Sequence, residues 1–385
     1  MAVREWTLFD QESQAPFREF AVTADEFPST PAPWRVTLRV LSAGLSQGVA
    51  LVEIDNGRLR FAIIPTRGMS LWRAWMGGQE LGWRSPVRGP VHPAFVPIAE
   101  PSGLGWLSGF DELMCRCGLE SNGAPDFDER GRLTYPLHGR VANLPAHELR
   151  LTVDDVAGTI SLHGIVEESR FHYQKLRLHT TYTTHFDSTR IAWRDEVENF
   201  GGSTAEMQML YHANIGQPQL DAGSTLVAPI TSVSPANSDT VAMGTNNWDL
   251  YSPPDANFRQ QVYQLGMIAD DHGDTRVLLK NSSATAGVRL SYNVRQLPCF
   301  SLWRNLVAGE DGYVTGLEPA TNFPNPRSWE AERKRVIQLA PARRWTAELA
   351  LDWFLEPAAV AEAERGIREL QGRRQVTVHA GIVDG

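Results

Sequence analysis

An alternation of apolar and polar residues through four successive segments constrains the fold of this chain more than any other feature. In residues 175–184, for example, polar side chains separate Leu176, Leu178 and Tyr182. Side chains two positions apart share one face of a β-strand, so this spacing predicts a strand with one buried face. Short polar linkers separate the segments, which predicts an antiparallel meander. The four segments are residues 149–153, 159–166, 175–184 and 190–200.

A hairpin is predicted nearer the N-terminus, where Asp55, Asn56 and Gly57 separate two apolar runs, residues 49–54 and 58–64. Asn and Gly accept the positive φ angles that tight hairpin turns need. Several later segments have similar strand-like patterns and predict more strands. The last of them is expected to be the final strand of the β domain. These segments are residues 277–282, 287–294, 300–305 and 344–354.

Helical periodicity is scarce along the chain. The clearest candidate is residues 358–370, which follow Pro357 and precede Gly372 and whose Ala, Val, Ile and Leu side chains can share a face. Residues 84–136 are rich in Gly and Pro and predict a long irregular segment, of the kind that usually carries function or packs over a site. We expect under about a fifth of the residues to be helical, against about a third in ordinary proteins.

These signals predict a mainly β fold of large antiparallel sheets, at least two of them facing each other, with few helices. The length of 385 residues does not settle the number of domains, because large all-β folds often run past about 200 residues as one unit. No repeat and no shift in composition marks a boundary. We expect an N-terminal arm at residues 1–19, one large β domain at residues 20–355 and a helical tail at residues 356–385.

The charge balance argues against two classes of partner. The chain carries 36 Lys and Arg against 45 Asp and Glu, for a net charge of -9, whereas nucleic-acid binding needs clustered cations. No run of about 18 apolar residues exists, so no membrane span is expected, and the polar N-terminus does not resemble a signal peptide.

Cysteine usage suggests a reducing compartment. The three cysteines, Cys115, Cys117 and Cys299, form no disulfide framework, which fits a cytoplasmic protein. The first two could bind a metal, but no second cysteine pair completes a zinc site.

Three apolar, strand-like segments each carry one titratable residue just before a turn: His138, His212 and Glu318. A histidine in such a place is more often a hydrogen-bonded structural residue than a catalytic one. Glu318 ends an apolar strand before Pro319, and a buried carboxylate suits the role of a general base, although a surface glutamate at a strand end is an equal alternative.

Two further residues have both a structural and a ligand-binding interpretation. Arg67 follows an apolar strand and could fork onto a pair of ligand oxygens or onto a carboxylate of the protein. Trp303 could stack on the face of a sugar, although most tryptophans belong to the core. The sequence contains no phosphate-binding P-loop, no G-x-S-x-G nucleophile motif and no H-E-x-x-H zinc motif.

Taken together, several ordered stretches resemble the aldose 1-epimerase, or galactose mutarotase-like, superfamily, and more closely an uncharacterised branch of it. They cover most of residues 50–330. The stretches are "IPTRGMSLWRAWMGGQELGWRSP", "LMCRCGLESNG", "YPLHGR", "YHANIGQP" and "YVTGLEPATNFP".

The resemblance implies a fold, a β-supersandwich of large antiparallel sheets with an open sugar-binding cleft. It also implies roles: His212 as general acid, Glu318 as general base and His138 as a ligand of sugar hydroxyls. Members of the family have an Asn after the acid histidine, and here Asn214 follows His212 by two residues. With Trp303, which could stack on a sugar, the expected substrate-binding residues are Arg67, His138, Arg140, Asn214 and Trp303.

Mutarotation explains why a histidine and a carboxylate are needed. One group removes a proton from the anomeric hydroxyl while the other protonates the ring oxygen, and the chemistry requires no metal or other cofactor. The leading hypothesis is therefore a cytoplasmic sugar 1-epimerase, or a related isomerase, that acts on a small-molecule sugar. The alternatives are a non-catalytic carbohydrate-binding or sensing protein on the same fold and a polysaccharide lyase or hydrolase.

Overall fold

The prediction of a mainly β protein is confirmed: 44% of the residues are in strands and 13% are helical. The computed structural model describes residues 3–13, 18–27, 30 and 33–383. The chain divides into two compact units, each assembled from three stretches of sequence. The first unit takes residues 1–80, 87–210 and 324–347, and the second takes residues 81–86, 211–323 and 348–385.

One sheet of the first unit is the predicted meander, which the structure confirms. Its strands follow one another in antiparallel order, and a strand from the N-terminus pairs with the first strand of the meander. In register, Leu162 lies opposite Tyr182 and Tyr182 opposite Trp193, so these apolar side chains share the buried face. The strands are β1 Val3–Asp10, β11 Ala146–Asp154, β12 Thr159–Ser169, β13 Lys175–His185 and β14 Arg190–Asn199.

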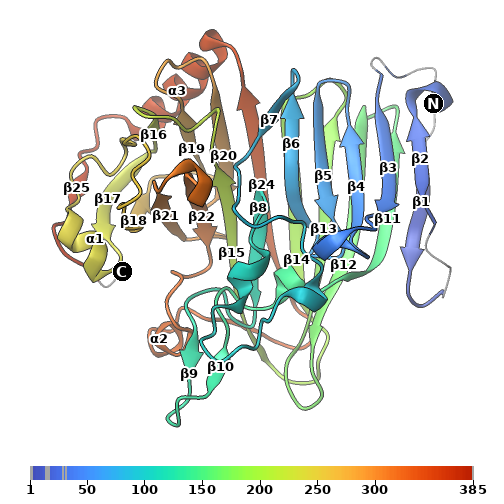
Figure 1. Cartoon of the computed structure of the whole chain (residues 1–385), viewed down its shortest axis with the longest axis horizontal. Coiled ribbons are helices and arrows are strands. Elements are labelled where there is room, and N and C mark those ends of the chain that lie inside the picture. The colour runs from blue at the N-terminus through green and yellow to red at the C-terminus, as the bar shows by residue number, and fades with distance from the viewer. Residues whose placement is uncertain (1–2, 14–17, 28–29, 31–32, 384–385) are drawn as a thin grey trace. The chain divides into compact units, whose positions relative to one another are not determined.

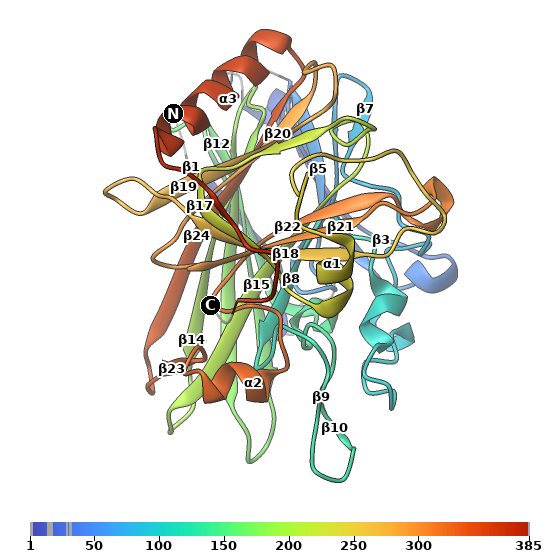
Figure 2. The ribbon, with the colours of Figure 1, turned by 90° about the vertical axis from the view of Figure 1, so that its left-hand side faces the viewer.

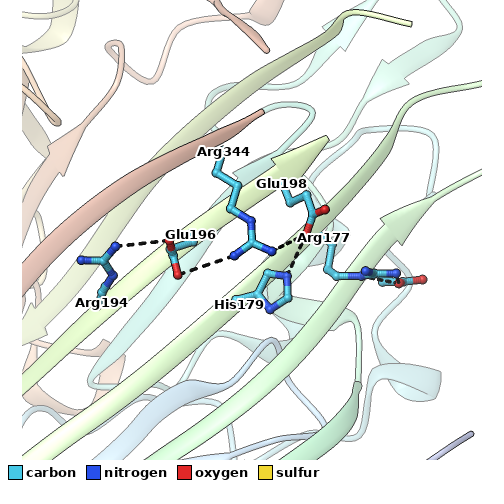
Figure 3. A network of polar contacts seen from close by, with 7 residues as sticks. Arg177, His179, Arg194, Glu196, Glu198 and Arg344 are labelled. Atoms are coloured by element: carbon cyan, nitrogen blue, oxygen red, sulfur yellow. Dashed lines mark hydrogen bonds and ion pairs between the residues drawn. The ribbon is translucent and has the colours of Figure 1, made fainter. Parts of the chain in front are cut away.

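Charged side chains occupy the other face of β13 and β14, as the alternation requires. His179 Nε2 lies 3.1 Å from an oxygen of Glu198, and the guanidinium of Arg344 donates to the same carboxylate at 3.0 Å (Figure 3). Arg194 contacts Glu196 on the same face. Ion pairs that are partly open to water contribute little each, about 0–1 kcal/mol, so this network marks the solvent face rather than a stabilising core.

The second sheet of the first unit contains the predicted hairpin, β4 and β5. The turn is held by Asn56, whose Oδ1 accepts hydrogen bonds from the backbone amides of Arg58 and Leu59. A short strand, β23 Ile337–Leu339, pairs with the start of β15. In order, the strands are β2 Phe20–Thr23, β3 Arg35–Val40, β4 Ala50–Asp55, β5 Leu59–Ile64, β6 Ser70–Met76, β8 Met114–Leu119 and the beginning of β15 Ala205–Ile215, with β7 Gln79–Leu81 beside β6.

These two sheets face each other, with the blue strands β3 to β6 in front of the green strands β12 to β14 in Figure 1. Polar groups also cross the core between them. The amide of Asn56 donates to the hydroxyl of Thr184 at 2.7 Å, and the guanidinium of Arg116 donates to Asp195 at 2.9 Å. Both partners of the Arg116–Asp195 pair are fully buried, so the loss of either one would leave an uncompensated charge in the core.

The second unit also contains two sheets. Tyr292 of one sheet stacks on Phe300 of the other, with the ring centroids 5.9 Å apart. One sheet is formed by β24 Arg344–Phe354, whose last residues belong to this unit, with β20 Gly287–Asn293, β19 Asp274–Lys280 and β16 Thr225–Val227. The other is formed by β22 Val314–Ala320, β21 Cys299–Asn305, β18 Gln261–Met267, β17 Ile230–Pro235 and β25 Thr377–Val378.

The C-terminal helix is α3, Pro357–Gln371, as predicted. Val360, Ala363 and Ile367 recur at helical spacing and pack on Leu278 of β19, and α3 lies beside β19 and β20 in Figure 2. Gly372, with φ of 60°, ends the helix. The other helices are short: α1 Ser238–Met243, α2 Arg327–Glu332 and the 3₁₀ turns Ala24–Glu26, Gly44–Ser46, Pro93–Phe95, Gly105–Gly109, Val141–Asn143 and Gly309–Asp311.

Residues 84–136 are less irregular than expected. They contain the fully buried strand β8 and a small two-stranded sheet, β9 Asp126–Phe127 with β10 Leu133–Tyr135. Since β8 is buried on both faces, its sequence shows no alternation that could have predicted it. Among the described residues, no helix is long and apolar enough to cross a membrane. The division into an arm, one β domain and a tail stays a prediction.

Candidate functional site

Two strands of the second unit place the predicted acid and base. His212 lies near the end of β15 and Glu318 in the middle of β22, and nearly every residue of both strands is buried. The two side chains are almost inaccessible, with His212 4% exposed and Glu318 3% exposed. A charged group at such a position needs a partner, because burial removes its hydration.

The partner of each is the other. Nε2 of His212 lies 3.3 Å from Oε1 of Glu318, which makes an ion pair when the imidazole carries its second proton. The structure therefore brings together two residues that are far apart in sequence. Their separation is within the range over which two groups can exchange protons with one small ligand.

Two more of the predicted residues lie beside this pair in the second unit. The indole ring of Trp303 on β21 meets the imidazole of His212 edge to face, with the centroids 5.4 Å apart. Trp303 is half-buried, and its Nε1 donates to Gln260 at 3.0 Å. Asn214 is fully buried, and its side-chain amide donates to the backbone carbonyl of His212 at 3.2 Å. Asn214 thus supports the backbone that carries the imidazole.

Gly316 provides the room for this arrangement. A Cβ atom built on Gly316 would lie 2.5 Å from Oε1 of Glu318, 3.0 Å from Cε1 of His212 and 3.2 Å from Cε3 of Trp303. Any larger residue would therefore press on all three side chains. The sequence contained a signal for this, a glycine two residues before the glutamate, but only the strand pairing shows what the glycine faces.

The remaining predicted residues belong to the first unit. His138 adopts a φ of 57° in the turn before Gly139, and its Nδ1 lies 2.9 Å from the carbonyl oxygen of Asn122. Its ring packs edge to face on Trp106 at 4.6 Å between centroids. Arg140 is half-buried and begins the 3₁₀ turn Val141–Asn143. Whether these residues bind a sugar stays a prediction.

A buried thiol accompanies His138. Burial raises the pKa of the Cys117 thiol, but hydrogen bonds from Cys115 and His138 and the charge of His138 together lower it to about 6. In the same unit, burial and the charge of Glu120 raise the pKa of Glu168 to about 7. Glu168 accepts a hydrogen bond from the backbone amide of Leu119 at 2.6 Å.

Arg67 has protein partners for most of its guanidinium. It is 1% exposed and forms an ion pair with Glu112 at 2.7 Å. It also donates to Oδ1 of Asn143 at 2.8 Å and to the carbonyl oxygens of Gly109 and Val91. Of the two interpretations that the sequence left open, these contacts support the one in which Arg67 binds a carboxylate of the protein. Its binding to a sugar stays a prediction.

No metal centre accompanies these residues in the part of the chain that the structure describes: no group of three or more His, Cys, Asp or Glu side chains is arranged to hold an ion. The site in the second unit contains an imidazole, a carboxylate and an indole, all three close to the backbone of one glycine, Gly316.

Comparisons with known proteins agree with this architecture. Residues 46–352 match the family model described as Domain of unknown function (DUF4432). A Klebsiella pneumoniae protein, provisionally described as an aldose 1-epimerase, is 32% identical, with 98% of each chain covered and a TM-score of 0.94. None of the curated proteins compared with this chain is similar enough to count as a match.

More distant structures share the fold alone. A galactose mutarotase-like protein from Clostridium acetobutylicum is 13% identical and has a TM-score of 0.55, with 83% of this chain and 98% of that chain covered. A galactose 1-epimerase from Lactobacillus acidophilus is 12% identical and has a TM-score of 0.53, with the same coverage.

Proposed function

Because this chain belongs to the DUF4432 family, a branch of the galactose mutarotase-like superfamily, we propose that it is a sugar 1-epimerase or a closely related sugar isomerase. The single observation that carries the proposal is the contact between His212 and Glu318, an acid and a base buried together at 3.3 Å. Mutarotation needs one group that gives a proton and another that takes one. Each of these two residues is held by a rigid strand.

The chemistry assigns one role to each residue. Glu318 removes the proton from the anomeric hydroxyl, and His212 gives a proton to the ring oxygen as the ring opens. Rotation about the C1–C2 bond then exposes the other face of C1, and the ring closes with both protons returned. The indole of Trp303, beside the imidazole, offers an apolar surface for one face of the sugar.

Three further assignments rest on the family resemblance. His138 and Arg140 are proposed to bind sugar hydroxyls, and Arg67 is proposed to do so only if its guanidinium can leave some of its present partners. None of the three cysteines, all of them described and buried, forms a disulfide, which supports the proposal of a reducing, cytoplasmic location.

Polarimetry tests the proposed activity directly. A freshly dissolved single anomer of D-glucose, D-galactose, L-rhamnose or D-glucuronate should approach equilibrium faster with the enzyme than in buffer. Saturation-transfer NMR on the same sugars separates activity from binding. Binding without faster anomer exchange on any sugar would favour a carbohydrate-binding protein, and a new reducing end from a polysaccharide would favour a hydrolase.

A further inference from the structure

A row of polar side chains starts at Glu318 and continues across the sheet of the second unit. Strand register places Ser301 of β21 opposite Glu318, Gln264 of β18 opposite Ser301, and Ser234 of β17 opposite Gln264. Directly opposed residues of antiparallel strands point to the same face. The row therefore lies on the face that carries the Glu318 carboxylate.

Ser301 is the member of this row next to the proposed base. It is 1% exposed, and its hydroxyl has no hydrogen-bond partner among the described residues. A buried hydroxyl without a partner is costly, so native proteins usually supply one from the protein, from water or from a ligand. A substrate hydroxyl beside Glu318 would satisfy Ser301.

The row is longer than one sugar ring. Neighbouring strands lie about 4.8 Å apart, which puts Gln264 about 10 Å and Ser234 about 14 Å from Glu318 across the sheet. A pyranose ring is about as wide as one strand spacing. A sugar ring bound by Glu318 and Ser301 would therefore not reach Gln264 and Ser234. These two side chains could contact a second group attached to that ring.

Exposure along the row also favours an extended ligand. Gln264 is half-buried, so its amide is more exposed to a ligand than the hydroxyl of Ser301 is. A side-chain amide both donates and accepts hydrogen bonds, which suits sugar hydroxyls.

We propose that this site takes a reducing oligosaccharide, with Ser301 contacting the ring that bears the anomeric carbon and Gln264 contacting the next sugar unit. This inference rests on the proposed function, since it extends from the same Glu318. It predicts a preference for a disaccharide over the monosaccharide that forms its reducing end.

The test compares D-glucose with maltose, cellobiose and lactose, three disaccharides whose reducing unit is glucose. The wild-type chain should exchange the anomers of at least one disaccharide with kcat/KM about 3- to 10-fold above that for glucose. This ratio corresponds to the free energy of about one additional hydrogen bond. Gln264→Ala should abolish this preference and leave the glucose rate unchanged, whereas Ser301→Ala should reduce both rates by a similar factor. Gln11→Ala removes an exposed glutamine amide from the first unit and should change neither.

The outcomes separate the inference from the proposed function. Equal rates for glucose and all three disaccharides, or a Gln264→Ala loss shared by glucose, would overturn the inference while anomer exchange itself still stood. If the protein exchanges the anomers of no sugar, the proposed function fails. The inference can then still be tested by saturation-transfer NMR, which gives the dissociation constants of glucose and of the disaccharides for wild type and for Gln264→Ala. Failure of all four sugars to bind would overturn both.

Discussion

At the scale of single residues, the contact between His212 and Glu318 explains why both side chains can be buried. Nε2 of His212 lies 3.3 Å from Oε1 of Glu318, and the half-buried indole of Trp303 lies against the imidazole. Mutarotation needs one group that gives a proton and another that takes one, and an imidazole and a carboxylate at this distance are suited to those two roles.

The strongest test at this scale is Glu318→Gln, which keeps the size of the side chain but removes the base. We expect kcat for anomer exchange to fall by about a hundredfold to ten-thousandfold. Sugar affinity should change much less, because glutamine still accepts one hydrogen bond from a hydroxyl. Glu310→Gln, at an exposed position of the same unit, is the matched control and should keep wild-type kinetics. Full activity in Glu318→Gln would show that another group is the base.

Gly316→Ala tests whether the close approach of these side chains to the glycine matters for activity. The backbone of Gly316 does not have a positive φ, so alanine is tolerated there, but its Cβ would press on Glu318 and His212. We expect about a hundredfold loss of activity, since small displacements of catalytic groups are that costly. The midpoint of thermal unfolding should move little.

Gly309→Ala provides the comparison, because a Cβ at Gly309 has no neighbour within 4 Å. An equal loss of activity in both variants, or none in Gly316→Ala, would mean that the packing of the pair does not limit the reaction.

At the scale of elements, the sequence predicted the strands that face water on one side. Leu176 and Leu178 of β13 point into the core, while Arg177 and His179 point outward, so the alternation was visible. It did not predict β8, because a strand buried on both faces carries no such pattern. β15 and β22, which carry the candidate site, are of the same buried kind, and their titratable residues rather than their periodicity drew attention to them.

Helix α3 allows a prediction about stability. Ile367 is 1% exposed and packs in the cluster with Leu278, Val360 and Ala363. Ile367→Ala should lower the free energy of unfolding by about 2–5 kcal/mol, the usual range for a large-to-small change in a core. Urea unfolding followed by circular dichroism measures it.

The exposed Glu369 on the same helix is the control, and Glu369→Ala should stay within about 0.5 kcal/mol of wild type. Equal destabilisation of the two variants would mean that the buried face of α3 does not account for its contribution to stability.

At the scale of the whole molecule, the candidate residues could be nominated from the sequence, but their neighbours could not. Strand order and register decide that Glu318 faces Ser301 and that His212 reaches Glu318, and neither can be read from local patterns. The partners of Arg67 show the same limit: Glu112 and Asn143 carry no sequence signal that relates them to Arg67.

The stability of the whole chain should depend on pH through Glu168. Burial, with the charge of Glu120, raises the pKa of Glu168 from 4.5 to about 7. Between these values the folded chain binds more protons than the unfolded chain, so this residue makes the free energy of unfolding fall as pH rises from about 4.5 to 7.

Glu168→Gln carries no charge at any pH and should remove that contribution, up to about 3 kcal/mol between pH 5 and pH 8. Urea unfolding at the two pH values gives the difference. The exposed Glu129→Gln should keep the wild-type dependence. An unchanged pH dependence in Glu168→Gln would mean that other groups set it.

The composition of each unit from three separate stretches of sequence has a consequence for how this protein can be cut or recombined. Cutting the chain at one position cannot release either unit intact. Neither unit is encoded by one continuous stretch of sequence that could be transferred to another gene. Strand β15 begins in one unit and ends in the other, so a fragment that stops near residue 210 divides a strand as well as a unit. Truncation libraries should therefore give few folded products, and natural variation in this architecture is expected in its loops rather than through exchange of its halves.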